Sequence, residues 1–301
     1  MDFVVNLNKP SNISSHRAAN EVRKILGAKK AGHAGTLDPL AEGVLLVCIN
    51  EATKISRFLS GLDKEYKAVI CLGQKTDTYD SEGKILRTGD ISGVGLADIE
   101  DVVRGFIGEI NQIPPMFSAI KSSGKPLYKL ARRGIVIERR PRKVRISDIE
   151  ILDFRKPLLV LGIRCSKGTY IRSLADDIGE SLGTGAHMCG LVRTRVGKFD
   201  LKDSVSIDRE LIRCNGIPMD KALAGMEEIV LDDRTSSRLR NGQVVYFSSL
   251  NVLNFKSIAN IDKSGFFRLK DGSGELFAIG TISDGWIKIA RNLLTKPKAI
   301  F

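Results

Sequence analysis

The segment from Gly32 to Gly43, GHAGTLDPLAEG, contains the side chain best placed for chemistry, Asp38. Its glycines allow tight turns and a close approach of the backbone, and Pro39 biases Asp38 away from helix. The apolar residues that follow predict a buried strand over Gly43–Ile49. An aspartate on a loop before a rigid strand is typical of a catalytic carboxylate. An Asp-Pro pair alone is more often a turn in which the aspartate bonds its own backbone, so the prediction depends on the whole segment.

A second segment, CSKGTYIR over Cys165–Arg172, joins an expected strand to an expected helix. Arg172 falls in the first turn of that helix and lies off its apolar face. A guanidinium group in this position can bind a carboxylate in a cleft through two parallel hydrogen bonds. A phosphate contact and an ordinary surface arginine are the alternatives.

A third segment, DKEYKA over 63–68, places Tyr66 at the start of an alternating, strand-like stretch. The ring of Tyr66 is either part of the core or a platform on which a nucleobase stacks. The pattern by itself favours the core.

Common cofactor and metal motifs are missing from the sequence. The Ser-Gly-Lys at 123–125 lacks the earlier glycine of a phosphate-binding loop, and the three histidines do not cluster with cysteines. We therefore expect no cofactor and no metal. The five scattered cysteines are typical of reduced thiols in a cytoplasmic protein. The longest apolar runs are too short to span a membrane. The first residues, MDFVVNLNKP, lack a basic region followed by a long apolar stretch, so we expect no secretion signal.

The net charge indicates a polyanionic partner. Lys+Arg exceeds Asp+Glu by 47 − 35 = +12, and the pI is about 9.5. Ten of the basic residues lie between Lys121 and Arg145 with a single acid, Glu138, among them. Such a segment can clamp a phosphate backbone. The alternative is a solvated surface arm.

The elements that must position these residues mix helices and strands without regular βαβ alternation, which predicts an α+β fold. Helices are expected after Ser14 up to Gly27, over 51–59, over 96–106 and over 169–182. Strands are expected from Tyr66 to Leu72, over 144–151 and over 158–165. Beyond residue 228, short apolar runs separated by glycines predict a small β-barrel. We expect a catalytic domain over 1–228, with the basic insertion at about 114–145, and a second domain over 229–301.

Four long stretches together resemble the TruB family of bacterial tRNA pseudouridine synthases. They read GHAGTLDPLAEGVLLVCINEATKISRFL, DKEYKAVICLGQKTDTYDSEG, IPPMFSAIKSSGKPLYKLARRG and CSKGTYIRSLADDIGESLGTGAHMCGLVRTRVG. The similarity covers roughly residues 3 to 225. The region beyond it resembles, more weakly, the RNA-binding PUA domain that often follows this enzyme.

This resemblance implies that the chain isomerises the uridine at position 55, in the TΨC loop of tRNA, after flipping the base out of the loop. The catalytic aspartate of the family motif falls on Asp38, and the arginine that pairs with it falls on Arg172. The expected substrate contacts are His33, Tyr66 as the platform under the flipped base, Tyr170, Leu191 and Asp80. An isomerisation is redox-neutral and needs no energy donor, which agrees with the lack of cofactor motifs.

Three rival functions remain open, and they make different use of the same residues. The first is an RNA-binding protein without catalysis, and the second is the guide-dependent branch of the superfamily, which works inside a ribonucleoprotein. The third is a hydrolase using His33 and Asp38, against which stands the lack of a serine or cysteine nucleophile motif. We expect tRNA to be the partner of a stand-alone monomer.

Overall fold

One large mixed sheet forms the framework of the chain. The structure is a computed structural model, and it describes residues 1–122, 124–247 and 265–293. Along the sheet the strands follow the order β14 (Ile217–Pro218), β1 (Phe3–Lys9), β3 (Glu42–Ile49), β12 (Ala186–Val196), β4 (Lys64–Leu72), β11 (Leu158–Cys165), β10 (Arg142–Arg155) and β7 (Gly108–Gln112). Two short strands, β2 (Ala31–Ala34) and β13 (Phe199–Asp200), pair with β3 and β12.

The strand directions confirm the α+β class. In the described part of this sheet, β3 and β12 run parallel, and the other named neighbours run antiparallel. The strand expected to follow Asp38 is confirmed as β3, and its buried residues explain the continuous apolar run in the sequence. The alternation from Tyr66 to Leu72 is confirmed as the alternating burial of β4.

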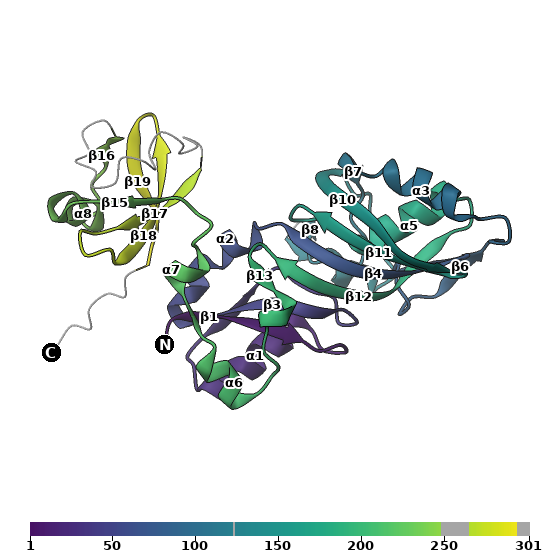
Figure 1. Ribbon diagram of the computed structural model, residues 1–301, viewed down its shortest axis with the longest axis horizontal. Coiled ribbons are helices and arrows are strands. Elements are labelled where there is room, and N and C mark those ends of the chain that lie inside the picture. The colour runs from purple at the N-terminus through teal and green to yellow at the C-terminus, as the bar shows by residue number, and fades with distance from the viewer. Residues whose placement is uncertain (123, 248–264, 294–301) are drawn as a thin grey trace.

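The three longest helices among the described residues cover one face of the sheet. Helix α1 (Ser15–Leu26) begins at the N-cap Ser14, whose hydroxyl accepts from the amide of Arg17, and ends at Gly27 in the left-handed conformation. Helices α3 (Leu96–Arg104) and α5 (Ile171–Ser181) lie behind the right half of the sheet in Figure 1. The apolar sides of α1 and α5 pack with the buried sides of β4 and β12 in one core.

Outside the insertion and the C-terminal part, the shorter helices are η1 (Asn50–Ile55), α2 (Ser56–Ser60), η2 (Leu201–Asp203), α6 (Arg209–Cys214) and α7 (Met219–Ala222). The expected helix over 51–59 is therefore a 3₁₀ turn followed by a short α-helix. Its hydroxyls explain the difference, because Thr53 donates to the carbonyl of Asn50 and Ser56 donates to that of Thr53. No helix among the described residues is long and apolar enough to cross a membrane.

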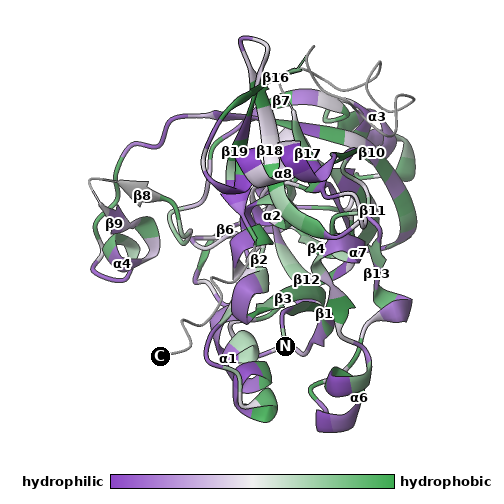
Figure 2. Cartoon of the chain, turned by 90° about the vertical axis from the view of Figure 1, so that its left-hand side faces the viewer, coloured by the Kyte–Doolittle hydropathy of each residue, from purple (hydrophilic) through white to green (hydrophobic). Residues whose placement is uncertain are grey.

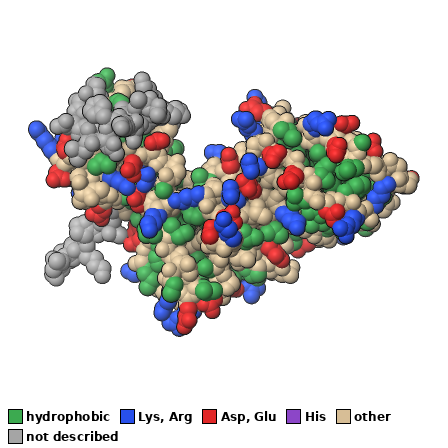
Figure 3. All heavy atoms as spheres, viewed as in Figure 1, with side chains coloured by type: hydrophobic (Ala, Val, Ile, Leu, Met, Phe, Trp, Pro, Cys, Tyr) green, Lys and Arg blue, Asp and Glu red, His purple; other side chains and the backbone are tan. Residues whose placement is uncertain are grey.

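The opposite face of β4, β11 and β10 lies in front in Figure 1. Figure 3 shows acidic and basic side chains interspersed across the middle of this face. Several of them neutralise one another: Glu65 pairs with Arg164 at 3.0 Å and with Arg195 at 3.6 Å. This face therefore presents balanced charge rather than a field of one sign.

The insertion between β7 and β10 contains a small hairpin and a short helix. Strands β8 (Lys121–Ser122) and β9 (Lys125–Pro126) pair, and α4 (Leu127–Ala131) follows directly. Figure 2 shows these elements projecting away from the body of the molecule, at the left of the view. A second small hairpin is formed by β5 (Gln74–Thr76) and β6 (Ile85–Thr88).

The C-terminal part forms a separate five-stranded sheet, at the left of Figure 1. Its order is β15 (Glu228–Val230), β17 (Phe266–Lys270), β18 (Leu276–Ser283), β19 (Trp286–Asn292) and β16 (Val245–Tyr246), and α8 (Asp233–Arg240) packs against it. It has an apolar core of its own. Residues 248–264 and 294–301 of the expected second domain lie outside the described residues.

The two sheets also share an apolar cluster. Ile279 and Leu293 of the C-terminal part are buried in the same cluster as Val4, Leu46 and Leu59 of the large domain. Beside this cluster, the rings of Phe58 and Phe266 meet edge to face, with centroids 5.1 Å apart. The contact joins β18 and the end of β19 to the strands behind the Asp38 loop.

Candidate active site

Asp38 lies on the loop between β2 and β3, and glycines shape both ends of that loop. Gly35 has φ = +82° and Gly43 has φ = +100°, a region that other residues rarely adopt. A Cβ atom at Gly43 would lie 2.3 Å from the carbonyl oxygen of Arg193 on β12. The expectation that these glycines serve a tight turn and a close backbone approach is confirmed.

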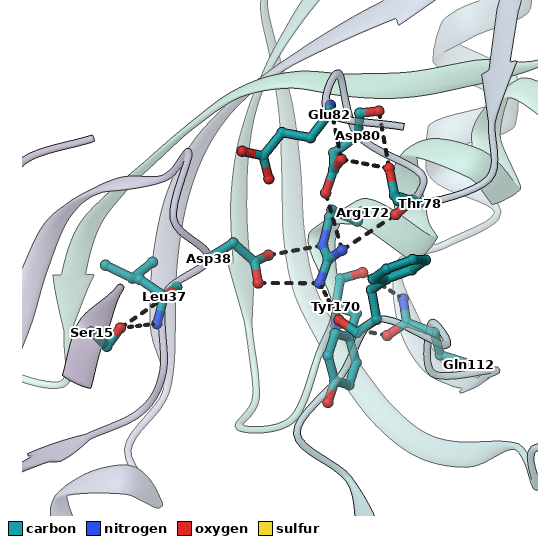
Figure 4. A network of polar contacts seen from close by, with 10 residues as sticks. Ser15, Leu37, Asp38, Thr78, Asp80, Glu82, Gln112, Tyr170 and Arg172 are labelled. Atoms are coloured by element: carbon teal, nitrogen blue, oxygen red, sulfur yellow. Dashed lines mark hydrogen bonds and ion pairs between the residues drawn. The ribbon is translucent and has the colours of Figure 1, made fainter. Parts of the chain in front are cut away.

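The loop is a turn, but the carboxylate does not close it. The amide of Ala41 donates to the carbonyl of Asp38 at 3.1 Å, so the backbone does turn at Asp-Pro. The side chain of Asp38 instead meets Arg172 in an ion pair with two contacts, 2.8 Å from Nε to Oδ2 and 3.1 Å from Nη2 to Oδ1. Figure 4 shows this arrangement. Asp38 and Arg172, which are 134 residues apart in the sequence, are therefore brought together.

The guanidinium of Arg172 is held from three further sides. Its Nη1 donates to Asp80 Oδ2 at 3.0 Å and to the carbonyl of Thr78 at 3.3 Å, and its Nη2 donates to the carbonyl of Phe117 at 3.0 Å. Arg172 is buried, so the alternative of an ordinary surface arginine is wrong. A planar cation fixed in this way presents its remaining edge to Asp38 in one orientation.

Asp80 lies behind Arg172 and is itself fully occupied. Its Oδ1 accepts from the hydroxyl of Thr78 at 2.6 Å and from the amide of Glu82 at 3.1 Å. The side chain is buried. In this structure Asp80 thus contacts the arginine that faces Asp38, and it reaches the cavity only through that arginine.

Burial and charge act in opposite directions on Asp38. Burial raises the pKa of its carboxyl above the ordinary value, the nearby Arg172 lowers that pKa, and the second carboxylate, Asp80, raises it again. The side chain is still 31% exposed, which leaves one side of the carboxylate open to a ligand. The site can therefore hold an ionised carboxylate that is partly desolvated and rigidly oriented.

The carboxylate faces a cavity of about 290 Å³. Tyr66 on β4 and Leu191 on β12 are almost fully buried and present their side chains to it. Tyr170 precedes α5, where its backbone exchanges two hydrogen bonds with the side-chain amide of Gln112, at 2.7 and 3.0 Å. A ring, an aliphatic side chain and a carboxylate around one cavity are suited to a flat, polar-edged molecule such as a nucleobase.

The core interpretation of Tyr66 is confirmed, and its position at the cavity is compatible with the platform role. The residue packs in the main core cluster and also lines the cavity. Burial raises the pKa of its phenol, so the hydroxyl stays protonated. A ring that is supported by the core on one side can still offer its other side to a ligand.

Like Asp80, His33 is an expected site residue that does not line the cavity. It lies on β2, half-buried, with an Nδ1 atom that has no hydrogen-bond partner in the structure. Burial, followed by His16 and Arg193, lowers the pKa of the imidazole. His33 is therefore neutral near pH 7, and it lies beside the Asp38 loop rather than inside the pocket.

Three residues that the sequence analysis missed hold the Asp38 loop. Ser15 is buried, and its hydroxyl both donates to the carbonyl of Leu37 at 2.9 Å and accepts from the amide of Leu37 at 2.8 Å. Lys9 donates to the carbonyl of Pro39 at 3.3 Å. Arg193 donates to the carbonyl of Gly35 at 3.0 Å. No local pattern marks these contacts, because each joins distant parts of the chain.

The basic insertion borders the same cavity. Phe117, Ser118 and Ala119 line its rim, directly before β8. Farther along, Arg132, Arg133 and most of their neighbours are exposed. Among the residues that the structure describes, no three His, Cys, Asp or Glu side chains form a group that could hold a metal ion.

Two family models match most of the large domain. Residues 23–171 match the model of the TruB family pseudouridylate synthase (N terminal domain). Residues 172–230 match the model of the tRNA pseudouridylate synthase B C-terminal domain.

The chain is also similar to two bacterial proteins over most of their length and its own. The chain is 42% identical to the tRNA pseudouridine synthase B of Pseudomonas fluorescens, over 93% of this chain and 92% of that protein. It is 46% identical to that of Clostridium tetani, over 80% of this chain and 85% of that protein.

Solved structures share the fold. A Cbf5-Nop10-Gar1 complex contains a chain with a TM-score of 0.73 and 28% identity, covering 97% of this chain and 84% of that one. An H/ACA RNP bound to a substrate RNA containing 2′-deoxyuridine gives the same TM-score at 25% identity, covering 98% and 86%.

Proposed function

Because the chain belongs to the TruB family of tRNA pseudouridine synthases, we propose that it isomerises the uridine at position 55, in the TΨC loop of tRNA, with Asp38 as the catalytic carboxylate. The chain is a pseudouridine-forming isomerase that acts on tRNA. The observation that carries the proposal for the site is the two-contact ion pair between Arg172 and Asp38 at the wall of a cavity that also holds Tyr66.

The reaction needs a base that has left the stack. The bond between C1′ of the ribose and N1 of uracil must break, and a bond from C1′ to C5 must form, while the C5 hydrogen is lost and N1 gains a proton. Flipping costs a few kcal/mol, which stacking and phosphate contacts offset. Tyr66 and Leu191 would hold the flipped base, and Tyr170 would border it from the start of α5.

Asp38 must be ionised to act as nucleophile or base. Arg172 favours the ionised form against the burial of the site, and Asp80 keeps Arg172 in place. We assign Asp38 the chemistry, Arg172 its orientation, and Asp80 a positioning role through Arg172. His33, outside the cavity, would meet the surrounding tRNA loop.

The remaining parts would bind the rest of the tRNA. The basic insertion at about 114–145 would contact the phosphate backbone beside the pocket. We propose that residues 229–301 form an RNA-binding PUA-like domain next to the catalytic domain of 1–228. We propose that the chain acts as a stand-alone monomer in the cytoplasm, without a guide RNA or cofactor.

A guide-dependent role is the second candidate, because one of the similar solved structures is an H/ACA RNP bound to a substrate RNA. Against it stand the named relatives, which are more similar to this chain, at 42% and 46% identity, than those structures, at 25% and 28%. A single assay separates the candidates, since only the stand-alone enzyme needs no guide.

The assay incubates the purified chain with an unmodified tRNA transcript, without guide RNA, ATP or added metal. Pseudouridine is then mapped by chemical sequencing. We expect modification at position 55 alone, and no product from a transcript with cytidine at that position. Binding without product by the intact protein would contradict the proposal and favour an RNA-binding protein.

A further inference from the structure

Two cationic side chains that no motif singled out line the same cavity as Asp38. They are Lys64 at the start of β4 and Arg193 on β12. Lys64 is 5% exposed and Arg193 is 1% exposed. A Cβ atom at Gly35 would lie 3.7 Å from Cε of Lys64 and 3.5 Å from Nη1 of Arg193, so both side chains reach the beginning of the catalytic loop.

Neither cation is neutralised by a carboxylate. Among the described residues, no Asp or Glu oxygen lies within ion-pair distance of Lys64 or Arg193, whereas Arg172 pairs with two aspartates. Burying a cation without a counter-charge is costly. A charge retained under these conditions calls for a partner that the free protein does not contain.

Backbone carbonyls fix both side chains but do not use all their donors. Lys64 donates to the carbonyl of Ser60 at 2.7 Å and to that of Leu62, and Arg193 donates to the carbonyls of Val44 at 2.7 Å and Gly35 at 3.0 Å. A lysine has three donors and an arginine has five. Even with the Tyr66 phenol beside Arg193, donors remain on both residues.

Lys9 provides an internal contrast. It is a third buried cation near the loop, and it also lacks an ion pair among the described residues. Its three donors are all used, on the carbonyls of Pro10, Ile13 and Pro39. Lys9 thus has a purely structural set of contacts, while Lys64 and Arg193 keep donors beside the cavity.

We propose that Lys64 and Arg193 form an oxyanion subsite in the pocket wall, which receives a negatively charged oxygen of the flipped nucleotide. The inference rests on the proposed function, because it takes the flipped uridine as the occupant of the cavity. Lys64, the more exposed of the two, makes the contact, and Arg193 adds positive charge behind it.

A nucleotide offers such an oxygen from two sources. The phosphodiester group carries a full negative charge before and throughout the reaction. The uracil becomes negative only when the C1′–N1 bond breaks, because the electron pair stays with the base and spreads from N1 onto O2 and O4. A subsite for the phosphodiester raises affinity, whereas a subsite for the uracil anion raises the rate of the bound complex.

The protonation of Lys64 supports this assignment. Burial, and then the neighbouring Arg193, lowers the pKa of Lys64 to about 8. The other charged or titratable groups that face it are Asp63, Cys165 and Lys167. Burial raises the pKa of Cys165 to about 11, so this thiol does not titrate over the same range. An anionic oxygen next to Lys64 would restore its preference for the charged form.

The test compares Lys64→Met with Lys67→Met. Lys67 lies on the same strand, but it is exposed on the opposite face, so its loss removes the same charge away from the pocket. For each variant, tRNA affinity is measured against salt concentration, and the single-turnover rate is measured at saturating protein. The melting temperature of each variant reports whether it is folded.

Two outcomes support the proposal and identify the source. A phosphodiester in the subsite predicts that Lys64→Met weakens binding about tenfold and flattens the slope of log affinity against log salt by about one. A uracil anion predicts unchanged affinity and a rate that is lower by about 10²-fold. A Lys64→Met protein that matches Lys67→Met in both affinity and rate overturns the proposal, and the proposed function stands if the wild-type chain still forms pseudouridine.

A third variant keeps the test decisive if Lys64→Met does not fold. In Lys64→Arg the charge persists above pH 9. The wild-type protein is expected to lose affinity or rate as the pH rises through about 8, because the lysine loses its proton there. The arginine variant should not show this loss. Identical alkaline profiles for the two proteins would refute a role for the Lys64 charge.

Discussion

The loop that carries Asp38 borders the pocket, and so do Phe117, Ser118 and Ala119, shortly before the basic segment from Lys121 to Arg145. The loop and the basic segment are held in opposite ways. The loop is fixed at Leu37 by Ser15, at Pro39 by Lys9 and at its start by Arg193, all through buried side chains. The basic segment consists of a two-strand hairpin, a five-residue helix and a largely exposed continuation.

Under the proposed function, this difference corresponds to two tasks, catalysis by the Asp38 loop and phosphate binding by the basic segment. A reacting carboxylate must be held in one geometry, because a misplacement of about 1 Å can cost 10²-fold in rate. Contacts with phosphates depend mainly on charge and tolerate movement. Changes in the loop should therefore act on the rate of the bound complex, and changes in the basic segment on affinity.

Asp38→Asn gives the largest expected effect. The substitution keeps the size and polarity of the side chain and removes the charge that nucleophilic or base chemistry requires. We expect no measurable turnover and a tRNA affinity close to that of the wild type. Single-turnover assays and filter binding measure the two quantities, and a rate above a few per cent of the wild-type rate would contradict the catalytic assignment.

Arg172→Ala should rank second, with a rate loss of about 10²- to 10³-fold at nearly constant affinity. Arg172 lowers the pKa of Asp38 against the effect of burial, so its loss should raise that pKa further. The carboxylate is then ionised only at higher pH, and the acidic limb of the rate profile should move upward.

Two comparisons distinguish the role of Arg172 in orienting Asp38 from a role as a phosphate contact. Arg172→Lys should not restore the full rate, since a point charge cannot make both contacts with Asp38. A loss of affinity with a flatter salt dependence, and with an unchanged acidic limb, would instead identify Arg172 as a phosphate clamp. Melting temperatures are needed as well, because Ala leaves the buried Asp80 unpaired.

Ser15→Ala tests the fixing of the loop itself. It leaves the amide and the carbonyl of Leu37 without their shared partner, next to Asp38. A single-turnover rate lower by about tenfold is expected at constant affinity. Ser14→Ala is the matched control, because Ser14 caps the same helix through an exposed contact with Arg17. Ser15→Thr keeps a hydroxyl and should recover part of the rate; equal rates for all three variants would exclude a positioning role.

The smallest expected effect comes from the basic segment. Replacing the exposed Arg132 and Arg133 by Gln should weaken tRNA binding several-fold and flatten its salt dependence by at most about two contacts, without changing the saturated rate. Arg155→Gln, which removes an exposed charge from the far end of β10, is the control. A slower saturated rate for the double variant would show that the segment also shapes the pocket.

The sequence predicted the centre of the site because its signals are local. The glycines around Asp38 predicted a turn, and the structure has that turn. The pattern around Arg172 predicted the start of a helix, and Arg172 is the second residue of α5. Lys64 was also within reach of such reasoning. The alternation of β4 places it on the same face as Tyr66, two residues away.

Other features depend on contacts that no local pattern encodes. Ser15 meets Leu37 because α1 packs against the loop, and the two are 22 residues apart. Asp80 reaches Arg172 over 92 residues. The helix expected over 51–59 begins as a 3₁₀ turn, because side-chain hydroxyls donate to its backbone carbonyls. The spacing of hydrophobic residues does not reveal these hydrogen bonds.

The apolar cluster that both sheets share links their folding. Ile279 and Leu293 cover Val4 and Leu46 on the strands that follow and flank the Asp38 loop. A chain cut before the C-terminal sheet would expose this patch to water, with a tendency to aggregate that has nothing to do with RNA. In the intact chain this cluster couples the large sheet to the C-terminal sheet. Unfolding of either sheet would expose the apolar residues of the other to water. Calorimetry is therefore expected to record one cooperative melting transition for the whole molecule.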